Sequence, residues 1–224
     1  MRTRALIAGI ALLVGAIGLH RVGRRSGVTE LETHAALAGD DLVPDPMWQS
    51  TRGITIDAVP EAIWPWLAQM GFPAHRGGWY TPHLLDMLTF GIRQRSAEEI
   101  VEELQCVEVG DRIPDSADGS VFFTVARADP PHALVLHSTR HVLKPIRTID
   151  FSWAFVVEDG STIGQSRLFI RARARYSPRW ACLFAEFVIG PADFVNAGGM
   201  LRGIKRRAES RRPVSRTGAA PTPD

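Results

Sequence analysis

Four strand-like stretches follow one another along the chain, at residues 120–128, 133–141, 147–157 and 164–175. Two of their connections consist of turn-forming residues, namely Asp129-Pro130-Pro131 and Glu158-Asp159-Gly160-Ser161. Short connections of this composition are typical of hairpin turns between neighbouring antiparallel strands. The pattern therefore predicts an antiparallel sheet in which consecutive strands pair.

The residues before these strands predict one further strand and several helices. Residues 52–58 alternate between apolar and polar side chains, which favours a strand. Pro60 suits the first turn of a helix, because the nitrogen at that position needs no donor. The other expected elements are the end of this helix at Gly71, short helices at Pro82–Phe90 and Ala97–Leu104, and a short strand at Arg112–Pro114.

A long helical pattern runs from Pro178 to Arg211, with a break at Gly190-Pro191. The pair Gly198-Gly199 weakens a helix, so the helix either bends there or approaches another backbone segment closely. The order of strand, helices, antiparallel strands and long helix indicates an α+β architecture. A curved sheet around a long terminal helix leaves a cleft between them, and such clefts hold apolar ligands.

Composition divides the chain into an N-terminal segment 1–25, a polar connector 26–50, a folded domain 51–211 and a tail 212–224 that we expect to be disordered. The first 25 residues carry five arginines and no acid, whereas residues 26–200 carry 14 basic and 22 acidic side chains. Residues 201–224 carry seven basic and two acidic side chains. An acidic body disfavours nucleic acid, and basic ends suit either an anionic membrane surface or solvent.

Residues 5–19 contain no polar side chain and are flanked by arginines, including Arg4 and Arg21. Fifteen residues are fewer than the roughly 20 that a straight membrane-spanning helix needs, but flanking arginines can extend such a span. The rival interpretation is a secretory signal peptide, and it expects a small-residue cleavage site where this chain has Arg24 and Arg25. We expect an uncleaved single-pass anchor in the cell membrane, with the domain facing the cytoplasm.

Standard catalytic and metal-binding patterns do not stand out in the sequence. There is no Gly-x-Ser-x-Gly motif and no phosphate-binding loop. His137 and His141 lie four residues apart on a predicted strand, about 13 Å, which is too far to share a metal. Cys106 and Cys182 are too few for a disulfide framework; each is expected to be a small buried side chain, and a bridge between them stays open. We expect neither a cofactor nor a metal.

Several segments resemble proteins of the SRPBCC superfamily, also called START-like or polyketide-cyclase-like proteins. Residues 54–71, Ile-Thr-Ile-Asp-Ala-Val-Pro-Glu-Ala-Ile-Trp-Pro-Trp-Leu-Ala-Gln-Met-Gly, resemble the opening strand and helix of that family. Arg76-Gly-Gly-Trp-Tyr80, Val109-Gly-Asp111 and residues 200–209 resemble a membrane-anchored, actinobacterial-type subgroup. The resemblance spans roughly residues 40–210.

This resemblance implies a helix-grip fold for residues 51–211, with a deep pocket between the sheet and the C-terminal helix. Relatives with that fold carry lipids, sterols or polyketides, and a minority catalyse cyclisation or hydroxylation. The subgroup implies no particular activity, so the chemistry has to be argued from the residues of the site.

Six residues are candidates for lining such a pocket: Trp79, Tyr80, Asp86, His137, Trp153 and Arg171. Aromatic walls with a few polar groups suit an amphipathic, mostly apolar molecule. Each residue also has a structural interpretation. Trp153 fits the core, Asp86 fits a cap or turn, and Arg171 fits an exposed strand face with Arg173 and Arg175.

Three functions are compatible with these observations. The first is a membrane-tethered binding or carrier protein for a hydrophobic small molecule, lipid-like or polyketide-like. The second is a polyketide-cyclase-like enzyme that uses His137, Tyr80 or Asp86 as acid or base. The third is an interaction protein whose pocket is filled with side chains. The sequence names no protein partner.

Overall fold

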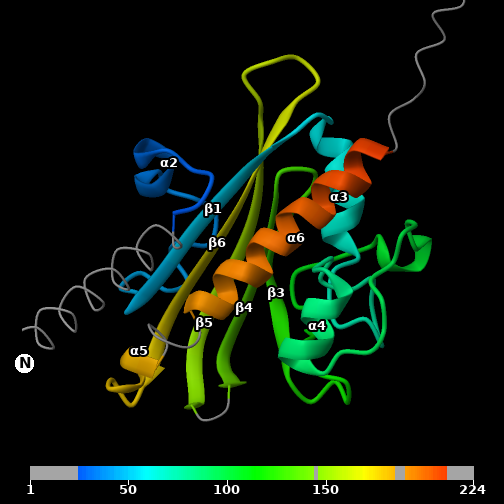
Figure 1. The fold of residues 1–224 in the computed structure, drawn as a ribbon. Coiled ribbons are helices and arrows are strands. Elements are labelled where there is room, and N and C mark those ends of the chain that lie inside the picture. The colour runs from blue at the N-terminus through cyan, green and yellow to red at the C-terminus, as the bar shows by residue number, and fades with distance from the viewer. Residues whose placement is uncertain (1–24, 144–145, 185–189, 211–224) are drawn as a thin grey trace, which may run out of the picture.

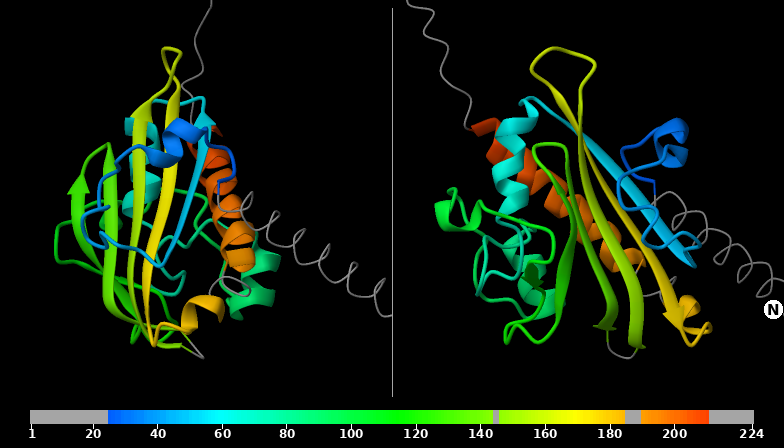
Figure 2. Two further views of the ribbon diagram at one scale, coloured as in Figure 1. Left: turned by 90° about the vertical axis from the view of Figure 1, so that its left-hand side faces the viewer. Right: turned by 180° about the vertical axis from the view of Figure 1, so that it is seen from behind.

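The computed structural model describes residues 25–143, 146–184 and 190–210, and its centre is a six-stranded antiparallel sheet (Figure 1). The strands lie in the order β1-β6-β5-β4-β3-β2. Their bounds are β1 (Trp48–Ile56), β2 (Arg112–Pro114), β3 (Phe122–Asp129), β4 (Ala133–Leu143), β5 (Ile146–Asp159) and β6 (Ser166–Ser177). The predicted antiparallel sheet is therefore confirmed, and its curvature is visible in Figure 2.

Alternation along the strands gives the sheet two differently covered faces. Leu168 and Ile170 of β6 belong to the main core, which includes residues of α3 (Pro60–Ala68) and α6 (Gly190–Ser210). We call this the inner face, and Figure 1 shows α6 crossing it diagonally. Phe169, between those two residues, packs on the opposite side in a separate cluster. The period of two is the geometric consequence of a pleated strand.

The inner-face core explains why α3 and α6 form where they do. Pro60 occupies the start of α3 as predicted, and Ile63 and Leu67 are fully buried one turn apart. Ile204 and Ala208 of α6 meet the same core. The α+β arrangement of a sheet with a C-terminal helix on one face is confirmed, and it is consistent with a helix-grip fold.

The outer face is covered by residues of the N-terminal connector. Its helix α2 (Glu30–His34) begins with a capping box, in which the backbone nitrogen of Glu32 donates to the Thr29 hydroxyl and that of Thr29 to the Glu32 carboxylate. Leu37 packs against Val135 and Phe169 on this face. The connector therefore contains more regular structure than its polar composition indicated.

Glycines in α6 allow the helix to approach the segment before α4 (His83–Phe90) closely. A Cβ atom at Gly199 would lie 2.7 Å from the Pro82 ring, and one at Gly203 would collide with the Tyr80 carbonyl oxygen. Gly198 is different, because a Cβ there would meet only the Arg202 side chain at 3.4 Å. Of the predicted glycine pair, Gly199 allows a close approach, to the Pro82 ring, and the close backbone approach is at Gly203.

The helical pattern after Pro178 corresponds to α5 (Ala181–Phe184) and to α6, which begins at the predicted break, and residues 185–189 lie outside the described residues. Two expectations need correction. Residues 97–104 form only the short 3₁₀ turn η1 (Glu102–Leu104) rather than a helix. Cys106 is exposed rather than buried, and both cysteines are free, so no bridge joins them.

Among the described residues, no helix is long and apolar enough to span a bilayer. The expected anchor at residues 5–19 and the tail 212–224 lie outside the described residues.

Candidate functional site

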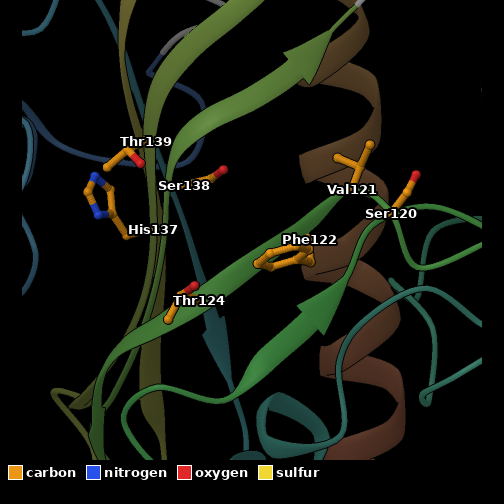
Figure 3. A pocket seen from close by; sticks show the side chains of 7 residues that line it. All are labelled: Ser120, Val121, Phe122, Thr124, His137, Ser138 and Thr139. Atoms are coloured by element: carbon orange, nitrogen blue, oxygen red, sulfur yellow. The ribbon is translucent and has the colours of Figure 1, made fainter.

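A pocket of about 360 Å³ lies where β3 and β4 separate. These strands pair from Asp129 and Ala133 as far as Thr124 and His137, and the pocket is at the end of that paired region. Its lining residues are Ser120, Val121, Phe122, Thr124, His137, Ser138 and Thr139 (Figure 3). The volume is at the lower end of the range for small-molecule sites.

His137 is the one titratable side chain in this pocket lining, and Asp150 orients it. The Nε2 atom of His137 lies 2.9 Å from Oδ1 of Asp150, and the two side chains are 20% and 38% exposed. Thr124 stands directly opposite His137 in the strand register. An imidazole held by a carboxylate beside hydroxyl groups can accept or donate a proton.

An aromatic cluster on the inner face adjoins the pocket. Trp153 is its centre, with ring centroids 5.2 Å from Trp79, 5.1 Å from Phe155, 5.9 Å from Phe123 and 6.2 Å from Phe151. We call these five residues the Trp153 cluster. Phe151 and Trp153 are only partly buried, so apolar ring surface remains accessible.

The strand register links this cluster to the pocket. Phe151 pairs with Ser138, which lines the pocket from the inner face. His137 is two residues from Val135 on β4, and Thr124 stands opposite His137, so both lie on the outer face with Val135. Figure 3 shows Ser138 on the opposite side of β4 from His137 and Thr139. His137 and the Trp153 cluster therefore lie on opposite faces of the sheet, and Ser138 is a lining residue that shares the inner face with the rings.

Tyr80 is buried among structural contacts. Its hydroxyl donates to the Trp66 carbonyl oxygen at 2.9 Å, and its backbone nitrogen donates to the Ser96 hydroxyl at 3.0 Å. The Arg207 guanidinium lies over its ring at 4.8 Å. Burial raises the pKa of the Tyr80 hydroxyl above its ordinary value. Its backbone has a positive φ of 60°, an uncommon conformation that these contacts hold in place.

Asp86 is also buried, at the start of α4. It accepts a hydrogen bond from the Thr81 hydroxyl, and burial raises the pKa of its carboxyl group. This contact closes the turn that leads into α4, which matches the structural interpretation of Asp86.

Arg171 lies on the outer face, so the structure separates it from the Trp153 cluster. Arg171 is only 2% exposed, so the prediction that it lies on an exposed strand face with Arg173 and Arg175 is wrong for this residue. Its guanidinium donates to five acceptors at 2.7–3.2 Å: the Thr51 hydroxyl, the Asp40 carboxylate, and the carbonyl oxygens of Glu32, Thr33 and Ala35. Arg171 thus fastens the connector to the sheet.

The six candidate residues therefore fall into four places. Trp79 and Trp153 share the aromatic cluster on the inner face, and His137 lines the pocket from the outer face. Tyr80 and Asp86 support the segment before α4, and Arg171 holds the connector on the outer face. Sequence patterns did not point to Asp150, because its pairing with His137 depends on the register of β4 and β5. That register shifts between Ser138 and His141, so counting residues around the turn would not have found the pair.

No group of three or more His, Cys, Asp or Glu side chains within the described ranges could hold a metal ion.

Neither a protein-family model nor a curated protein matches the sequence. Solved structures with overall similarity include protein MLL2253 from Mesorhizobium loti, 14% identical over 74% of this chain and 100% of its own, with a TM-score of 0.43. Protein NE0264 from Nitrosomonas europaea is 11% identical over 74% and 97%, with a TM-score of 0.46. Protein Ms6760 from Mycobacterium smegmatis is 12% identical over 70% and 88%, with a TM-score of 0.42. These names state no activity, and at such values the function has to be argued from this chain's own residues.

Proposed function

We propose that this chain is a START-like protein that binds or carries a hydrophobic small molecule, lipid-like or polyketide-like, at the membrane. The observation that carries the proposal is the Trp153 cluster, in which Phe151 and Trp153 are only partly buried, and Ser138, the register partner of Phe151, lines a pocket of about 360 Å³. Aromatic surface with a few convergent polar groups is the usual composition of a small-molecule site. The ligand's apolar part packs on the partly buried rings of Phe151 and Trp153.

The sequence and exposed apolar side chains support a location at a lipid surface. Leu84 and Leu88 of α4 are 63% and 73% exposed, and Phe194 near the start of α6 is 43% exposed. Figures 1 and 2 show α4 and the start of α6 toward the same end of the molecule. Exposed Arg93 and Arg95 follow α4, and apolar groups bordered by arginines suit an anionic bilayer. Together with residues 5–19, these features favour a tethered domain that receives its ligand from the membrane.

Replacing Trp153 with alanine is expected to weaken binding of the neutral fluorescent probe N-phenylnaphthylamine about tenfold, because ring contacts and buried apolar area are lost. Trp180→Ala is the matched control, since Trp180 is 67% exposed and lies outside the cluster. The full-length chain in a nonionic detergent is titrated with the probe, and both variants are compared with the parent. Equal loss of affinity in the two variants would place the binding site elsewhere.

A second candidate function, acid–base catalysis, is favoured by the His137–Asp150 pair. A general base there would exchange the α-protons of a β-ketoacyl thioester with solvent. With acetoacetyl-N-acetylcysteamine in heavy water, the enzyme hypothesis expects deuterium incorporation that falls at least about a hundredfold in His137→Ala, with probe binding retained. Exchange no faster than in buffer would exclude this chemistry for that substrate class and leave the carrier function.

A further inference from the structure

Arg52 is a buried arginine between β1 and α6. It is 1% exposed and pairs with Ile170 in the strand register, so its side chain lies on the inner face. Its Nη1 atom donates to Oδ2 of Asp193 at 2.5 Å and to the Ser50 hydroxyl at 3.1 Å. The Phe194 ring lies against the guanidinium at 5.8 Å.

The other edge of this guanidinium is unused. Its Nε and Nη2 atoms are buried and have no hydrogen-bond partner among the described residues. In an arginine these two N–H groups point the same way, and their spacing matches the two oxygens of a carboxylate. Buried donors without acceptors are rare and unfavourable, so this edge favours a ligand that supplies two acceptor oxygens.

Arg52 lies on the same face of the sheet as the proposed apolar site. Ser50 pairs with Ala172, which pairs with Trp153, so one row of the inner face leads from Arg52's neighbour to the aromatic cluster. Ala172 is the small residue between them. The indole Nε1 of Trp153 and the Oδ1 of Asn196 are also buried without a partner among the described residues.

The charge balance leaves room for an additional anion. Asp193 lies in the first turn of α6, where the helix dipole stabilises a negative charge. Its side chain is 16% exposed, whereas that of Arg52 is 1% exposed. The recorded contact of Asp193 is with Nη1, which leaves the Nε and Nη2 edge of Arg52 for a further anionic group.

From these contacts we infer that Arg52 binds the carboxylate of an apolar acid through Nε and Nη2, with the hydrophobic part of the acid against the Trp153 cluster. This inference rests on the proposed binding function and specifies its ligand class. The same edge would leave an alcohol of equal size with only one oxygen for two donors.

In the test, the full-length chain in a nonionic detergent is incubated with equal amounts of an acid and its matched alcohol. The two pairs are dodecanoate with dodecanol and naphthoate with naphthylmethanol. Protein-bound ligand is separated from micelles, extracted and quantified, and the acid-to-alcohol ratio is compared with that of empty micelles. We expect the protein to enrich the acid about tenfold or more. Arg52→Lys keeps the positive charge but cannot donate two parallel hydrogen bonds to one carboxylate. This variant should bind acid and alcohol in about the same ratio as empty micelles.

Two variants serve as references. Arg167→Lys, on the outer face, should retain the parent ratio. Asp193→Asn removes the competing negative charge while keeping an acceptor for Nη1, so it should increase the enrichment of the acid. Equal binding of acid and alcohol by the parent, or an unchanged ratio in a folded Arg52→Lys variant, would overturn the carboxylate assignment and leave the binding function intact. Failure of the parent to bind any of the four compounds would contradict both.

Discussion

Gly203→Ala is expected to lower the free energy of unfolding by about 3 kcal/mol or more, the upper range for an overpacked site. A Cβ atom at this position collides with the carbonyl oxygen of Tyr80. Backbone atoms cannot rotate away as a side-chain tip can, so α6 has to move from the segment before α4. Denaturant unfolding of the variant should show a correspondingly lower midpoint.

Gly198→Ala is the matched control, because Gly198 precedes Gly203 by about five residues in the same helix. A Cβ atom at Gly198 would meet only a flexible arginine side chain. Alanine is a better helix former than glycine, so this variant should be about 0.5–1 kcal/mol more stable than the parent. Opposite signs for the two substitutions are the expected result. If both were neutral, the close approach of α6 to Tyr80 would be contradicted.

Arg171→Met should cost about 3–5 kcal/mol of unfolding free energy, which is typical when one partner of a buried ion pair is removed. The methionine leaves the Asp40 carboxylate and the connector carbonyl oxygens without their donor. Because these acceptors lie between residues 32 and 40, the variant should also become sensitive to protease within the connector.

Arg175→Met provides the comparison, since Arg175 is an exposed arginine on the same strand and face. Its effect should stay within about 0.5 kcal/mol, as for an ordinary surface substitution. Equal stability and equal protease resistance in both variants would show that Arg171 does not hold the connector on the sheet.

Much of the sheet could be predicted because turn residues and alternation mark its strands directly. The four consecutive strands were placed within a few residues, and Pro60 marked the start of α3. The first strand begins at Trp48, four residues before the predicted start. Ser50 is polar although it lies on the inner face, so the apolar alternation that identified the strand does not extend back to Trp48.

The outer face could not be predicted from local pattern. Alternating Arg171, Arg173 and Arg175 look like a solvated strand face, yet Arg171 and Arg173 donate to backbone oxygens of the connector. Burial of those arginines depends on a segment more than a hundred residues away in the chain. The period of a strand says which residues share a face, and it does not say what covers that face.

The site was predicted in part for a similar reason. Residue type identified Trp79, Trp153 and His137, and the structure places the two tryptophans together on the inner face while His137 lines a pocket from the outer face. Tyr80 and Asp86 were chosen by the same criterion, but their contacts are those of a tightly packed turn. Chemical type alone does not distinguish a residue that faces a ligand from one that supports a loop.

The most direct test of the binding function is native mass spectrometry of the full-length chain, released gently from detergent after isolation from the membrane fraction. We expect an intact chain that retains residues 1–25 and carries a reproducible apolar adduct, which is lost on denaturation and depleted in Trp153→Ala. A soluble chain that begins after residue 25 would contradict the tether. A ligand-free mass that stays unchanged after incubation with lipid extract and with the apolar acids would contradict the carrier function itself.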